Sequence, residues 1–168
     1  MASFLSFPIL ITAAIMQATF LPNMRLFGGA PDLVYLLVLA WAINANLTNS
    51  ILWAFVGGLA VDLLSVQPLG TSTFGMLLTV FVINGLGDQL YRIGVLTLIA
   101  LVFVGTVVQQ ISILGILALT GFAVDWLYGL SYIIAPTIVY NLIAIWPVYW
   151  FVRRVQRRIE RRGGFSVD

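Results

Sequence analysis

Three residue types are missing from this chain of 168 residues: cysteine, histidine and lysine. Without cysteine and histidine there is no disulfide, no thiolate nucleophile, no imidazole for acid-base catalysis, and none of the usual zinc or haem ligands. Without lysine, Schiff-base chemistry and a P-loop lysine are excluded. Charged residues make up only 8% of the chain, whereas soluble domains carry about a quarter. The composition therefore excludes a water-soluble globular protein, and we expect no cofactor.

The chain is instead rich in long apolar segments. Hydrophobic residues make up 61% of it, and the mean hydropathy is +1.07. Because a membrane-spanning helix needs about 20 mostly apolar residues, the pattern predicts an all-α integral membrane protein, a six-helix transmembrane bundle over residues 1–152. The expected spans are about 4–21, 33–47, 50–66, 71–85, 93–122 and 130–152. A five-span arrangement, with the first segment in the interface or the N-terminus on the other side, is the alternative.

Several of the predicted spans have individual features. The first lacks the basic region and small-residue cleavage site of a signal peptide, so we expect it to remain in the mature protein. The fifth is long enough that it must tilt, bend or break near the adjacent Gln109 and Gln110. After an expected turn at 123–129, the last span contains Pro136 and Pro147, which predict kinks.

The basic residues are concentrated at one end of the chain. Six of its eight arginines lie in the segment 153–168, which we interpret as a basic cytoplasmic tail. These six are Arg153, Arg154, Arg157, Arg158, Arg161 and Arg162. By the positive-inside rule, six spans then place both termini in the cytoplasm. We interpret the arginines as topology determinants that also attract anionic lipids; a cytoplasmic partner is the alternative, and nothing indicates nucleic-acid binding.

Asp62 is the only acidic residue inside a predicted span. An aspartate near the bilayer centre costs about 2.5 to 3.5 kcal/mol on insertion scales, and the cost falls toward the interface. We place Asp62 about one turn from the outer end of its span. One interpretation is a polar contact to a partner or substrate. The other is a carboxylate paired with a helix N-terminus or with the hydroxyls of residues 71–73.

Other polar residues in the spans favour a structural interpretation. Gln109, Gln110 and Asn141 are interpreted as helix-packing residues, since interhelical amide hydrogen bonds contribute only about 0.6 to 2 kcal/mol. A polar site at mid-bilayer is the alternative for the two glutamines. The aspartates of the spans and turns are scattered over different segments, so the sequence predicts no catalytic set and no enzyme.

Three short motifs stand out in the first half of the chain: Ala-Pro-Asp-Leu-Val at 30–34, Gly-Gly-Leu-Ala-Val-Asp-Leu-Leu-Ser at 57–65 and Pro-Leu-Gly-Thr-Ser at 68–72. In sequence, order and spacing they resemble the family of the rod shape-determining protein MreD. The resemblance implies a non-catalytic component of the elongasome in the bacterial inner membrane. It further implies binding to MreC, and through MreC a connection to MreB filaments, to RodA and to a class B penicillin-binding protein. Its consequence for the cell would be maintenance of rod shape during sidewall peptidoglycan synthesis.

The resemblance also suggests where MreC binds. Carried over to this sequence, Pro31 and Asp32 shape the start of the second helix. Asp62 shapes the hairpin between helices three and four together with Pro68, Leu69 and Gly70. We expect the outer face formed by these residues to receive the transmembrane or juxtamembrane segment of MreC.

A rival interpretation comes from the same resemblance. The family is similar in fold to the S-components of energy-coupling-factor vitamin transporters, which are six-helix membrane proteins. An S-component-like subunit would hold a ligand in an outward-facing polar pocket and dock on a transport module through Ala14 and Ala18. Small residues at this spacing also permit association with a second copy of the chain. The sequence offers few outer polar groups for a vitamin and only short turns for a lid.

Overall fold

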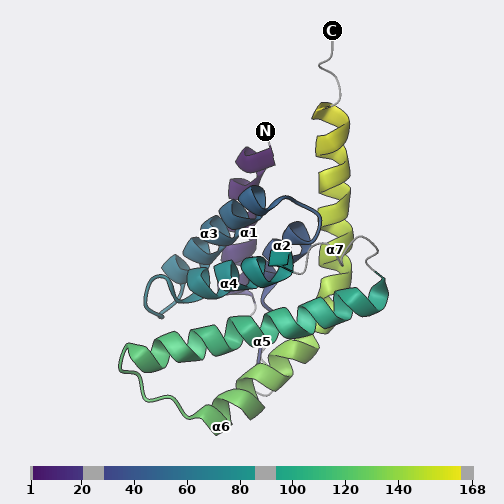
Figure 1. The fold of residues 1–168 in the computed structure, drawn as a ribbon. Helices are drawn as coiled ribbons and strands as arrows, with labels where there is room; N and C mark the ends of the chain where they lie inside the picture. The colour runs from purple at the N-terminus through teal and green to yellow at the C-terminus, as the bar shows by residue number, and fades with distance from the viewer. Residues whose placement is uncertain (1, 21–28, 86–93, 164–168) are drawn as a thin grey trace.

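The protein is a bundle of helices (Figure 1). The computed structural model describes residues 2–20, 29–85 and 94–163. Their elements are α1 (Ala2–Thr19), α2 (Leu33–Ala42), α3 (Leu47–Leu64), α4 (Thr71–Gly85), α5 (Val95–Leu119), α6 (Trp126–Tyr128), the π-helix η3 (Gly129–Ile134) and α7 (Ala135–Gly163). Since α6, η3 and α7 follow one another without a gap, the described segments form six helical rods. The all-α prediction is confirmed.

The central element is α2. Nine of its ten residues are buried, and it contacts α1, α3, α4, α5 and α7. A helix that is apolar on all sides is stable only where other apolar surfaces enclose it. The indole rings of Trp41 and Trp53 stack with centroids 4.0 Å apart and join α2 to α3.

The expected length of the second span was wrong. The sequence predicted a helix to about residue 47, but α2 ends at Ala42. The physical reason is Asn46, whose side-chain oxygen accepts a hydrogen bond from the Asn49 N–H at 3.2 Å and so caps the start of α3. A helix of ten residues is about 15 Å long, half the thickness of a bilayer core.

Three helices are long and apolar enough to cross a membrane. They are Leu47–Leu64, Val95–Leu119 and the continuous helix Trp126–Arg158. Three further apolar helices, Phe7–Thr19, Leu33–Ala42 and Thr71–Gly85, are shorter. The six-helix segmentation therefore agrees with the structure, while six full crossings stay a prediction.

The two helices with predicted irregularities differ from each other. α5 runs unbroken through Gln109 and Gln110, and it lies at a large angle to the C-terminal half of α7 (Figure 1). The last helix begins at Trp126 and not near residue 130, because the Asp125 carboxylate caps it by accepting hydrogen bonds from two backbone N–H groups. The π-helix η3 ends at Ile134, two residues before Pro136, which is the second residue of α7. α7 contains Pro147 and changes direction along its length (Figure 1).

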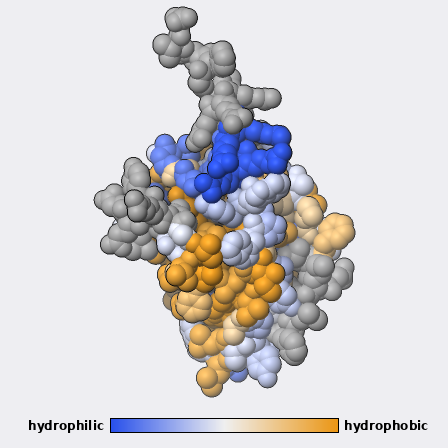
Figure 2. All heavy atoms as spheres, turned by 90° about the vertical axis from the view of Figure 1, so that its right-hand side faces the viewer, coloured by the Kyte–Doolittle hydropathy of each residue, from blue (hydrophilic) through white to orange (hydrophobic). Residues whose placement is uncertain are grey.

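The first turn of α1 and the last turn of α7 lie at the same end of the molecule (Figure 1). α7 continues to Gly163 across the predicted boundary between residues 152 and 153. Figure 2 shows hydrophilic residues gathered at this end and a broad hydrophobic surface below them. Such a surface is typical of a protein that faces lipid.

Candidate functional site

The turn between α3 and α4 is held by one buried carboxylate. Asp62 is 2% exposed. Its Oδ1 accepts a hydrogen bond from the Ser72 N–H at 2.8 Å, and its Oδ2 accepts from the Gly70 N–H at 2.9 Å and the Thr73 N–H at 3.2 Å. The Thr73 hydroxyl donates a fourth bond to Oδ2, at 2.7 Å. The carboxylate therefore satisfies backbone donors at the start of α4, where a negative charge also complements the helix dipole.

The turn itself faces outward while its backbone is fixed. Leu69 is 69% exposed and Val66 is fully exposed. Gly70 has φ +95°, a left-handed conformation that favours glycine. The Thr71 hydroxyl donates to the Pro68 carbonyl at 2.7 Å and closes the turn from its other side. The result is a rigid loop with an apolar side chain at its tip.

A second polar cluster lies at the start of α2. The Asp32 Oδ1 accepts hydrogen bonds from the Tyr35 N–H at 3.1 Å and from the Gln17 Nε2 at 3.0 Å. The Gln17 Oε1 in turn accepts from the Val34 N–H at 3.0 Å. The Asp32 N–H donates to the Asn141 Oδ1 at 3.0 Å, and the Asn141 Nδ2 donates to the Thr106 hydroxyl at 3.2 Å.

This cluster joins four helices, α1, α2, α5 and α7. It brings Asp32 together with Asn141, two residues that the sequence assigned to different roles. Gln17 and Thr106 were missed, although an isolated glutamine in an otherwise apolar helix is a signal that could have identified the first. Pro31 lies beside the cluster and is partly buried. Asp62 belongs to the separate group of the α3–α4 turn.

The two adjacent glutamines have different surroundings. Gln109 is completely buried, and neither its Nε2 nor its Oε1 has a hydrogen-bond partner among the described residues. Its amide lies against Gly75 of α4, where an added Cβ would be 2.7 Å from Oε1. Gln110 is partly exposed. Ala14 is 2% exposed within the chain's own core, whereas Ala18 is exposed, so only the second is open to another molecule.

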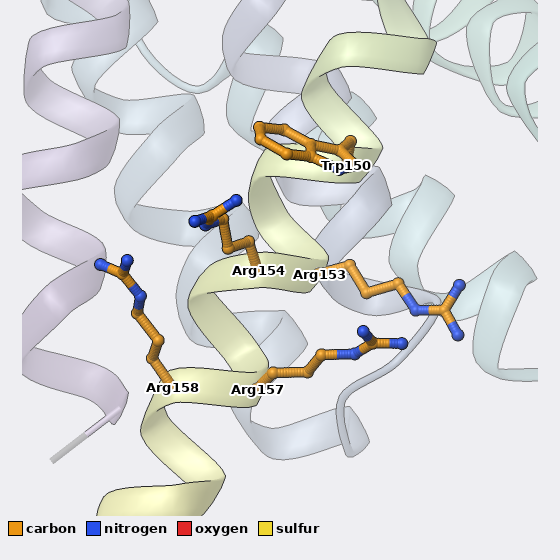
Figure 3. Close-up of a pocket in the computed structure, with 5 residues that line it drawn as sticks. All are labelled: Trp150, Arg153, Arg154, Arg157 and Arg158. Atoms are coloured by element: carbon orange, nitrogen blue, oxygen red, sulfur yellow. The ribbon is translucent and has the colours of Figure 1, made fainter.

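The arginines lie along the last turns of α7. Arg153, Arg154, Arg157 and Arg158 are exposed and, with Trp150, bound a surface cavity of about 400 Å³ (Figure 3). The Arg154 Cζ lies 5.1 Å from the centroid of the Trp150 ring, a cation–π arrangement. Arg161 and Arg162 belong to α7, but their side chains lie outside the described residues, as do Arg25, Asp88 and Arg92.

The fold and the hydrogen-bonded clusters indicate the class of protein to which the chain belongs. Among the described residues no group of three or more acidic, histidine or cysteine side chains could hold a metal ion. Long apolar helices surround two clusters of structural hydrogen bonds, an arrangement typical of a polytopic helical membrane protein.

The particular family follows from the sequence as a whole. Residues 1–159 match the family model of the rod shape-determining protein MreD. The chain therefore belongs to the MreD family, which confirms the resemblance and implies a role in rod shape determination. No curated protein and no solved structure matches the chain, and the similarity to S-components stays a prediction.

Proposed function

We propose that this protein is a non-catalytic scaffold that binds MreC in the bacterial inner membrane, with both termini in the cytoplasm. Through MreC it helps couple MreB filaments to sidewall synthesis by RodA and a class B penicillin-binding protein. Membership of the MreD family supports the role in cell shape. The first turn of α1 and the last turn of α7 lie at the same end of the molecule, which supports an even number of crossings (Figure 1).

The observation that carries the proposed MreC contact is the α3–α4 turn. Asp62 fixes the backbone of this turn with four hydrogen bonds, and Leu69 projects from it. A turn that is already fixed loses little conformational entropy when a partner binds. More of the free energy gained by burying the exposed Leu69 side chain therefore appears as affinity. Asp62 itself is buried, so its part in MreC binding is to shape the turn. Pro31 and Asp32 act in the same indirect way through the α2 cluster.

The test is co-purification of the full chain on tagged MreC from the same organism. Leu69→Asn should reduce the amount of captured chain by at least about fivefold, which corresponds to about 1 kcal/mol. The matched control is Leu119→Asn at the end of α5, where the leucine is 88% exposed, and it should leave capture unchanged. Equal losses in the two variants would contradict the proposed contact.

A parallel purification separates the scaffold from the S-component alternative. Here the bait is the transport module of an energy-coupling-factor transporter. The proposal predicts capture by MreC alone. Capture by the transport module, or saturable vitamin binding in the absence of MreC, would overturn the scaffold function.

A further inference from the structure

An apolar groove lies between α1 and α7. Both helices pack on α2 while making little contact with each other, and the space between them has a volume of about 630 Å³. Its walls include Ile9, Ala13, Met16, Leu37, Pro147 and Phe151. In a bilayer such a groove is filled by apolar atoms of a lipid or of another protein, because its walls offer few polar partners.

The same face of α7 carries the groove wall and two of the arginines. Pro147 and Phe151 line the groove, and Arg154 and Arg158 follow at spacings of three and four residues, which places them on the same side of the helix. In Figure 3, Arg154 and Arg158 extend to one side of α7 and Arg153 and Arg157 to the other. Toward the C-terminus of α7 the apolar groove is therefore followed by two positively charged side chains, Arg154 and Arg158, which form the cationic end of the groove.

The three carboxylates whose side chains the structure describes lie elsewhere in the bundle. Asp32, Asp62 and Asp125 each accept hydrogen bonds at the start of a helix. Figure 2 shows the hydrophilic end next to the hydrophobic surface. Trp150 precedes the arginines along α7 and lies against Arg154, and tryptophan is the residue type enriched at the headgroup level of membranes.

We propose that the groove and this cationic end together bind one anionic phospholipid. An acyl chain occupies the groove between α1 and α7, and the phosphate lies against the guanidinium groups of Arg154 and Arg158. Guanidinium binds phosphate through paired, charge-assisted hydrogen bonds, and basic pockets beside transmembrane helices are suited to lipid headgroups. Trp150 holds Arg154 in position through the cation–π contact.

A phospholipid fits both parts better than a protein helix does. It carries its hydrocarbon and its negative charge on one molecule, in the order in which the groove and the arginines follow along α7. This site is also remote from the α3–α4 turn, which lies away from the C-terminal end of α7 (Figure 1). The lipid site therefore does not depend on the proposed MreC contact.

The experiment is native mass spectrometry of the purified full chain with phosphatidylglycerol, phosphatidylcholine or sn-glycerol 3-phosphate added. The proposal predicts one retained phosphatidylglycerol, weaker retention of phosphatidylcholine, and no retention of glycerol phosphate, which has a phosphate but no acyl chain. Replacing Arg154 and Arg158 together by glutamine should lower the affinity for phosphatidylglycerol by at least about tenfold, because the variant loses both guanidinium groups that form charge-assisted hydrogen bonds with the phosphate.

Two matched controls separate a built site from general attraction. Arg153 and Arg157 bound the same surface cavity but extend to the other side of α7 from Arg154 and Arg158 (Figure 3). Replacing both by glutamine removes the same charge and should lower the affinity less than the loss of Arg154 and Arg158 does. Thr12 lines the groove, so Thr12→Phe should fill it and lower retention of both phospholipids. Thr19→Phe, at an exposed position of α1 that is not among the residues lining the groove, should not.

Three results would overturn the proposal. Equal losses in the two arginine pairs would show diffuse electrostatic attraction without a site. Retention of glycerol phosphate as strong as that of phosphatidylglycerol would show that the groove takes no part. Unchanged lipid retention in Thr12→Phe, together with loss of MreC capture, would identify the groove as a protein-docking surface.

Discussion

Thr73 donates two hydrogen bonds to the Oδ2 of Asp62, one from its backbone N–H at 3.2 Å and one from its hydroxyl at 2.7 Å. Gly58, one turn before Asp62 on α3, also lies against Thr73: a Cβ at position 58 would be 2.3 Å from the Thr73 Cα. The two contacts hold the start of α4 directly on α3. They also give a physical reason for the glycine and the aspartate of the sequence motif at 57–65.

Loss of the Asp62 carboxylate should destabilise this hairpin strongly. Asp62→Ala leaves the backbone N–H groups of Gly70, Ser72 and Thr73 without their acceptor. We expect the free energy of unfolding to fall by about 2 to 4 kcal/mol, from the loss of a helix cap and of buried hydrogen bonds. Thermal unfolding of the purified chain in detergent measures the change.

The control for this prediction is Asp125→Ala. Asp125 also caps a helix, but it is exposed, so water replaces its hydrogen bonds and the loss should be smaller. A larger loss in Asp125→Ala than in Asp62→Ala would show that the α3–α4 turn is not held by its carboxylate.

Gly58→Ala should also lower stability. The added Cβ meets the backbone of Thr73, which cannot move away in the manner of a flexible side chain, and overpacking of this kind costs about 1 to 3 kcal/mol. In contrast, a Cβ at Gly115 of α5 meets no atom within 4 Å. Gly115→Ala should therefore raise the melting temperature, because alanine favours a helix over glycine by about 1 kcal/mol. A melting curve of each variant gives the sign.

We expect opposite effects on stability when the buried amide side chains of Asn141 and Gln109 are removed. Asn141→Leu removes the acceptor of the Asp32 N–H and the donor to Thr106, and should cost about 1 to 3 kcal/mol. Gln109→Leu removes an amide whose two polar atoms have no partner among the described residues, and should be neutral or stabilising. Thermal unfolding of the two variants side by side is the measurement. A larger loss in the glutamine variant would contradict the assignment of Asn141 as the amide that joins the helices.

Much of the fold follows from local sequence signals. Apolar length predicted the helical segments, and the expected start of the fourth span at residue 71 agrees with α4, which begins at Thr71. The early end of α2 was missed because most of the run from Leu33 to Leu47 is apolar. In the structure Asn46 caps the start of α3, and the Asn44 side chain donates to the Ala40 carbonyl at 3.3 Å, beyond the end of α2. The start of the last helix was also missed. We expected Asp125 to lie in a turn at 123–129, but its carboxylate caps a helix that already begins at Trp126.

The candidate site was predictable in part. The sequence offered two interpretations of Asp62, and the structure has the one in which the carboxylate pairs with a helix N-terminus. The link between Asp32 and Asn141 spans 109 positions in the chain, and spacing along one sequence cannot reveal such a tertiary contact. The same holds for the groove between α1 and α7, which depends on how both helices pack on α2.

The most direct test of the central claim is photo-crosslinking in living cells of the chain's own organism. A photoreactive amino acid replaces Leu69 at the tip of the α3–α4 turn, or Leu119 at the end of α5 as the control. The account predicts a covalent adduct with MreC from position 69 and none from position 119. Adducts of equal yield from both positions, or an adduct from position 119 alone, would contradict the claim that the turn held by Asp62 is the surface that contacts MreC.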